Sequence, residues 1–165
     1  MNKMKMNHSM KMEHSMTEPK EIIIMMIIMF IAGLFSSMNV WVDKISDIRF
    51  HLNDVYMSLL MCSWSLIFMG IYYIDAKILL FGILFTGLMI YCIRNQLFID
   101  ESEYINGMIP HHSMAVLMSK ELLKKALNKD IYLSNDIKTL SKHIVDTQNN
   151  EINFMKSDNN TKKRY

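Results

Sequence analysis

Three long apolar segments, none with a charged residue or a histidine, constrain this chain more than any other feature. They occupy residues 22–41, 55–74 and 78–93. A helix that crosses the hydrocarbon core of a bilayer needs about twenty apolar residues. The first two segments have that length, and the flanks extend the third. A chain of 165 residues could not bury three helices that are apolar on every side. The pattern therefore predicts three transmembrane helices rather than a soluble core.

The basic residues around these segments indicate an orientation. Five lysines belong to the side of the N-terminus and of the second connection: Lys3, Lys5, Lys11, Lys20 and Lys77. Three basic residues belong to the opposite side: Lys44, Arg49 and Arg94. Cytoplasmic loops carry the excess of Lys and Arg. We therefore expect an integral protein of the plasma or inner membrane, with a cytoplasmic N-terminus and an extracytoplasmic C-terminal domain.

Charge and cysteine content exclude other classes of protein. The formal net charge is only +2, and no basic stripe alternates with aromatic residues, so we expect no nucleic-acid partner. Two cysteines in apolar segments cannot form a disulfide framework. Counted from the turn at residues 75–77, Cys62 and Cys92 lie at similar depth on neighbouring helices. A thiol pair for a metal is thus conceivable, although membrane cysteines are more often apolar fillers.

Residues 1–20 form a Met- and His-rich segment ahead of the first apolar run, and residues 4–16 repeat a six-residue unit. Every even position of the repeat is Met or His: Met4, Met6, His8, Met10, Met12, His14 and Met16. The segment is too polar and too short to bury anything, so we expect it to be disordered. Because thioether sulfur prefers soft cations such as copper(I), the repeat predicts a flexible metal chelator. A compositional bias toward Met and Lys is the alternative interpretation.

After residue 95 the chain becomes amphipathic and predicts two helices. Asp100, with Glu103 three residues later, is typical of a capping box, and a first helix should run from there to about residue 127. Residues 128–130 break the pattern, and a second helix should run from residue 134 or 135 to about residue 155. We expect an antiparallel hairpin over residues 96–157 and a polar tail over residues 158–165.

The first of these helices contains the densest group of metal-ligand residue types, MIPHHSMAVLM at residues 108–118. Four of its residues recur at a spacing of three or four and share one face, with His112 beside them: Met108, His111, Ala115 and Met118. Four residues of the second helix share a face as well: Ile144, Gln148, Glu151 and Met155. The two faces together could hold a metal ion. Methionine and histidine at helical spacing also occur as ordinary core residues.

At these two motifs the sequence resembles the family called domain of unknown function 305, a ferritin-like helical bundle. The resemblance covers about residues 98–157 and includes M-x-x-H-H-x-x-A-x-x-M followed by Q-x-x-E-I-x-x-M. Members are usually exported or membrane-anchored, and several are linked to copper binding and tolerance, so the resemblance implies copper(I) here. It implies five ligands: Met108, His111, His112, Met118 and Met155. Gln148 and Glu151 would hold these ligands in place. Where the family commonly has Trp after the last Met, this chain has Asp158.

The expected fold class is all-α: three transmembrane helices followed by a hairpin that forms half of a ferritin-like four-helix bundle. Two helices alone provide too little core to be stable. A homodimer in the bilayer would complete the bundle by two-fold symmetry, with a metal site between subunits.

The leading functional hypothesis is a membrane-anchored protein that binds copper(I), or silver(I), in metal sequestration, delivery or tolerance. It needs no organic cofactor and no catalysis, and a copper transporter or copper chaperone would be its partner. One alternative is a dimerising membrane anchor without metal. The other is a copper-dependent redox enzyme, which is disfavoured because the helices lack a Glu-x-x-His pair and the chain lacks H-E-x-x-H, serine-nucleophile and Gly-rich phosphate motifs.

Overall fold

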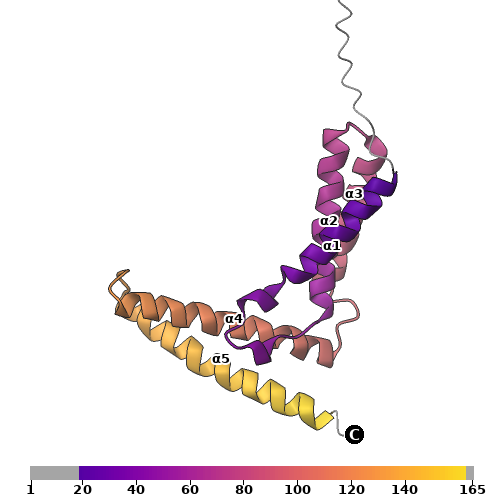
Figure 1. Ribbon diagram of the computed structural model, residues 1–165. Helices are drawn as coiled ribbons and strands as arrows, with labels where there is room; N and C mark the ends of the chain where they lie inside the picture. The colour runs from indigo at the N-terminus through magenta and orange to yellow at the C-terminus, as the bar shows by residue number, and fades with distance from the viewer. Residues whose placement is uncertain (1–18, 163–165) are drawn as a thin grey trace, which may run out of the picture.

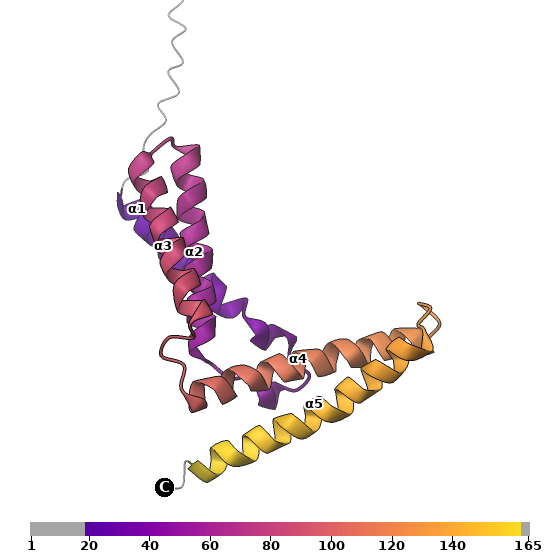
Figure 2. The same ribbon diagram turned by 180° about the vertical axis from the view of Figure 1, so that it is seen from behind.

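The computed structural model describes residues 19–162, with side chains described up to residue 157, and this range folds entirely into helices and connections. The elements are α1 (Pro19–Phe35), the 3-10 helices η1 (Met38–Trp41) and η2 (Ile45–Asp47), α2 (Leu52–Tyr72), α3 (Ala76–Arg94), α4 (Glu101–Leu127) and α5 (Asn135–Lys162). Helices α1, α2 and α3 pack side by side, and the α4–α5 hairpin lies across one end of them (Figure 1). The molecule is therefore L-shaped, as the view from behind also shows (Figure 2).

The three predicted apolar helices are confirmed. The ranges Pro19–Trp41, Leu52–Tyr72 and Ala76–Arg94 are each long and apolar enough to cross a membrane. Helix α1 has no buried residue and leaves large aliphatic side chains uncovered, among them Ile23, Ile24, Ile27 and Ile28. So much contiguous apolar surface is characteristic of a membrane or protein interaction face.

The first helix ends earlier than the apolar pattern predicts. It stops at Phe35 instead of continuing to Trp41, and Ser37 has an extended backbone before η1. Asn39 explains the break, because its side-chain amide pairs with the backbone of Arg49 in both directions, at 2.8 and 2.9 Å. This pairing folds residues 36–51, which we call the connecting segment, back on itself.

Small and polar residues set the packing of α2 against α3. Asp75 caps α3 by accepting hydrogen bonds from the backbone N–H groups of Lys77 and Ile78. Gly70 meets the backbone of the neighbouring helix so closely that a Cβ there would lie 2.5 Å from the Leu79 nitrogen. Deeper in the helix pair, the Thr86 hydroxyl donates to the Ser63 hydroxyl at 2.9 Å and marks the register.

That register corrects the prediction that the two cysteines lie at similar depth. Cys62 is one residue farther from the turn than Ser63, whereas Cys92 is six residues farther than Thr86. The difference corresponds to about 7.5 Å along the helix axis. The Cys62 thiol instead donates to the Met26 carbonyl of α1 at 3.6 Å.

The predicted hairpin is present, with two differences at its ends. Asp100 caps α4 by accepting from the Glu103 N–H, but the Glu103 carboxylate accepts from the Leu52 N–H at 2.6 Å and so ties α4 to the start of α2. Helix α5 continues past Met155 to Lys162. Residues 158–162, expected in the polar tail, are therefore helical.

The connecting segment covers one side of α4 (Figure 2). The Asp43 backbone N–H donates to the Ser113 hydroxyl at 2.8 Å, and that hydroxyl donates to the Asp47 carboxylate at 2.6 Å. Lys120 pairs with Asp43, and Lys156 pairs with Asp47. The chain thus supplies part of the cover that we expected from a second copy, and completion of a four-helix bundle by dimerisation stays a prediction.

Candidate metal site

The register of the hairpin brings four of the predicted residues together. His112 Nε2 on α4 lies 2.9 Å from Glu151 Oε2 on α5. Because the helices are antiparallel, one turn along places Met108 opposite Met155. Met155 is part of the buried core of the hairpin, and Met108 packs against that core. We call Met108, His112, Glu151 and Met155 the hairpin cluster.

Hydrogen bonding defines the chemical state of His112. Its Nδ1 lies 2.7 Å from the Met108 carbonyl oxygen. A carbonyl can only accept, so Nδ1 carries a hydrogen and donates it. In the neutral imidazole, Nε2 then has a free lone pair that faces the Glu151 carboxylate. Two acceptors at a hydrogen-bond distance of 2.9 Å need a proton between them, and a metal ion would have to displace that proton.

The structure separates the other predicted ligands from this cluster. His111 is exposed, with its ring centroid 6.1 Å from that of His112, and the Met118 side chain is 57% exposed. Gln148 is half-buried. The predicted face through Met108, His111 and Met118 is thus not the one that packs. The buried residues of α4 that recur at helical spacing are instead Ile105, Ile109, His112, Val116 and Ser119.

The predicted N-terminal chelator, at Met4, Met6, His8, Met10, Met12, His14 and Met16, lies outside the described residues. Its metal binding stays a prediction.

Sequence analysis missed a second polar group where α1, the connecting segment and α2 meet. His51 is 1% exposed, and neither of its ring nitrogens has a hydrogen-bond partner. Its Nε2 lies 3.4 Å from Oδ1 of the buried Asp54, whose other oxygen accepts from Asn39 at 3.2 Å. The signal in the sequence was a His and an Asp three residues apart at the start of an otherwise apolar helix.

A third polar group joins the hairpin to the connecting segment. Burial by itself raises the pKa of Asp47, but hydrogen bonds from Lys156, Ser113 and Ser46 together with the Lys156 charge outweigh it. The pKa of Asp47 therefore lies below its ordinary value. A carboxylate that is already paired with an ammonium group is a structural anchor and a poor metal ligand.

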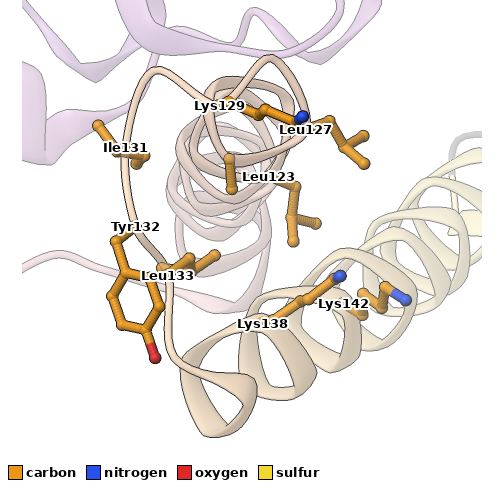
Figure 3. A pocket seen from close by; sticks show the side chains of 9 residues that line it. Leu123, Leu127, Lys129, Ile131, Tyr132, Leu133, Lys138 and Lys142 are labelled. Carbon is orange, nitrogen blue, oxygen red and sulfur yellow. The ribbon is translucent and has the colours of Figure 1, made fainter.

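Over residues 19–157, whose side chains are described, no three or more His, Cys, Asp or Glu are grouped so that they could hold a metal ion. A metal site in this part of the chain would therefore need thioether donors. The cavity at the hairpin tip does not provide them: it is lined by Leu123, Leu127 and loop residues, with Lys138 and Lys142 of α5 on its other side (Figure 3).

Comparison with known proteins places the hairpin in a family. The family model described as "Domain of unknown function (DUF305)" matches residues 98–158. Over 141 residues the chain is 43% identical to "Uncharacterized protein L153" of Acanthamoeba polyphaga mimivirus, covering 82% of this chain and 89% of that protein. The chain belongs to the DUF305 family. The resemblance seen in the two motifs is confirmed, and the likeness to the mimivirus protein extends beyond the DUF305 hairpin into the apolar helices. No solved structure shows a significant match.

Proposed function

We propose that this DUF305 protein is a membrane-anchored binding protein for a soft cation, copper(I) or silver(I), that acts in metal sequestration, delivery or tolerance. The observation that carries the proposal is the register of the hairpin. In support, Met155 belongs to the buried core of the hairpin and Met108 packs against that core, on the two helices that carry Glu151 and His112.

The chemistry of these donors favours a soft cation. Thioether sulfur is neutral and polarisable and prefers copper(I), whereas imidazole accepts several metals. The Met108 carbonyl orients the His112 ring through Nδ1, an arrangement typical of metal-binding histidines, and Nε2 would bind the metal in place of its present contact with Glu151. Glu151 would offset the positive charge of the bound ion.

The mechanism is capture and ligand exchange, without catalytic turnover. The three apolar helices would hold the hairpin at the bilayer surface, where a copper transporter or chaperone could exchange the ion with it. The Met/His repeat at residues 4–16 would be a separate chelator on the other side of the membrane.

One observation favours the alternative of a dimerising anchor without metal. A protonated His112 satisfies both the Met108 carbonyl and the Glu151 carboxylate, and Met155 then acts as a core residue. All polar groups of the hairpin cluster thus have partners when a proton takes the place of a metal ion. Metal binding must therefore be measured directly.

The test is a copper(I) titration of the full-length protein in detergent against a chromophoric copper(I) chelator. The test variants are His112→Gln and the double variant Met108→Leu/Met155→Leu, which conserves core volume. The matched controls are His111→Gln and Met118→Leu, because both residues are exposed. Glu151→Gln reports on the supporting carboxylate, with an expected loss of about 10- to 100-fold in affinity.

We expect the two test variants to lose a tight copper(I) equivalent and the controls to keep it. Equal binding by wild type and both test variants would refute a metal site in the hairpin and leave the dimerising anchor. Loss of binding in the controls alone would show that the ligands are the exposed residues. Copper-dependent redox turnover of substrates would support the enzyme alternative.

A further inference from the structure

A cavity of about 590 Å³ opens beside His51, at the end of the three-helix unit nearest the hairpin. Its lining includes the three methionines Met38, Met57 and Met61, together with His51 and Asp54. Met57 and Met61 are on the open side of the cavity, 58% and 38% exposed, so they would have to turn inward to bind an ion. None of these residues belongs to the hairpin cluster, and none lies in the family match at residues 98–158.

Helical geometry explains why these groups share the cavity. His51 is the residue just before α2, and Asp54, Met57 and Met61 follow at spacings of three and four on the same face. Met38 comes from η1, which the paired Asn39 and Arg49 hold against this end of α2. The cavity therefore combines one imidazole with three thioether groups, and these residues belong to two separate elements, η1 and the start of α2.

The state of His51 indicates that the cavity has a ligand. A polar group that is buried without a hydrogen bond lowers stability by about 1–3 kcal/mol. His51 is 1% exposed, with neither ring nitrogen hydrogen-bonded, while Asp54 and Asn39 beside it are paired with each other. The ring lies against Gly107 of α4 on the Nδ1 side and faces Asp54 with Nε2, and it therefore has unused donor or acceptor capacity next to a cavity that three methionines line.

We propose that this cavity is a second site for a soft monovalent cation, with His51 as the nitrogen ligand and Met38, Met57 and Met61 as thioether ligands. Asp54, 3.4 Å from His51 Nε2, positions the ring and balances the charge of the ion. Soft neutral donors favour copper(I) and silver(I) over zinc or magnesium. The site shares no residue with the hairpin cluster, although the His51 ring lies against α4 at Gly107.

The experiment uses full-length protein with ¹⁵N-labelled histidine in detergent micelles, titrated with silver(I), which is redox-stable. The ring nitrogen signals of His51, assigned with His51→Asn, report on this site separately from other histidines. The test variant is Met57→Leu/Met61→Leu. Its matched control is Met25→Leu/Met29→Leu on α1, which has the same spacing but does not line the cavity. Helical circular dichroism checks that each variant folds.

We expect silver(I) to shift the His51 signals in wild type and in the control. In Met57→Leu/Met61→Leu the shift should disappear at silver concentrations that saturate wild type. Asp54→Asn should weaken binding about 10- to 100-fold.

Two results would overturn the proposal: His51 signals that move with pH but not with silver(I), and an unchanged silver response in Met57→Leu/Met61→Leu. Loss of the copper(I) equivalent in the hairpin variants together with a normal His51 response to silver(I) would show two separate sites. A wild-type protein that binds copper(I) in the hairpin but gives no His51 response would refute this second site alone.

Discussion

At the scale of single residues, the adjacent histidines of α4 show how much one position matters. His112 faces the partner helix and is held by the Met108 carbonyl and the Glu151 carboxylate, whereas His111 faces solvent. Neighbouring residues of a helix point about 100° apart, so the two cannot serve one site from the same face. A single residue is also decisive in the connecting segment. There Asp47 contacts both helices of the hairpin, through Ser113 of α4 and Lys156 of α5.

Asp47→Asn should weaken the attachment of the connecting segment to the hairpin by about 1.5–3 kcal/mol at neutral pH, because it removes a charge that accepts several hydrogen bonds. The pKa of Asp47 is lower in the folded protein than its ordinary value of 3.8. The stabilisation is therefore complete above that ordinary value and is lost as the pH falls through the lowered pKa. Chemical denaturation of both proteins between about pH 2 and pH 7 measures this. A stability difference that does not shrink in acid would contradict the assignment.

At the scale of elements, the distance between packed helices depends on where their facing side chains are small. Gly70 and Gly82 let α2 and α3 approach until backbone meets backbone, since a Cβ at either would lie within 3 Å of atoms of the facing helix. Gly87, on the same pair of helices, has no neighbour within 4 Å. Close approach through small residues is a general mode of packing for helices in membranes.

Gly70→Ala should therefore destabilise the helix pair by about 1–3 kcal/mol, the usual effect of overpacking, because the Leu79 backbone cannot move aside. Gly87→Ala is the matched control and should be neutral or stabilising by up to about 1 kcal/mol. Thermal unfolding in detergent, followed by circular dichroism, compares the two. Similar melting temperatures for both variants would show that α2 and α3 do not pack this closely.

At the scale of the whole molecule, the arrangement separates two ends. Lys20 and Lys77 lie near one end of the three-helix unit, and the hairpin lies across the other (Figure 1). This agrees with the grouping of basic residues from which we predicted the orientation. Which end faces the cytoplasm stays a prediction, as does the presence of a second copy on the hairpin.

Cysteine labelling of cells or sealed vesicles tests the orientation. In a background with Cys62→Ala and Cys92→Ala, a cysteine in place of Lys77 and one in place of Ser134 should react with a membrane-impermeant reagent from opposite sides. We expect Ser134→Cys to react from outside, because the lysine-rich end should face the cytoplasm. Reaction of both from the same side would contradict a membrane-spanning arrangement of α2 and α3 with the hairpin beyond them.

The mass of the detergent-solubilised protein tests dimerisation. On α5, Leu140 is 51% exposed and Phe154 is 72% exposed, which leaves apolar surface for a second hairpin. We expect a dimer by light scattering, and a monomer after Leu140→Lys/Phe154→Lys, because a charge in an apolar contact must be desolvated. Lys142→Ala, on the same helix, should remain dimeric. A wild-type monomer would show that the connecting segment alone completes the hairpin.

The sequence by itself determined the helices, because apolar runs, caps and helical spacing are properties of short segments. It was sufficient for the three apolar helices, the cap at Asp100 and the two motifs of the hairpin. Only the tertiary structure decided which face of α4 is inside, where α1 ends and that His51 is buried at a cavity lined by three methionines. Those outcomes depend on contacts such as Asp47 with Ser113, which are 66 residues apart. No local pattern encodes them, because the register between distant segments depends on how all their side chains pack at once.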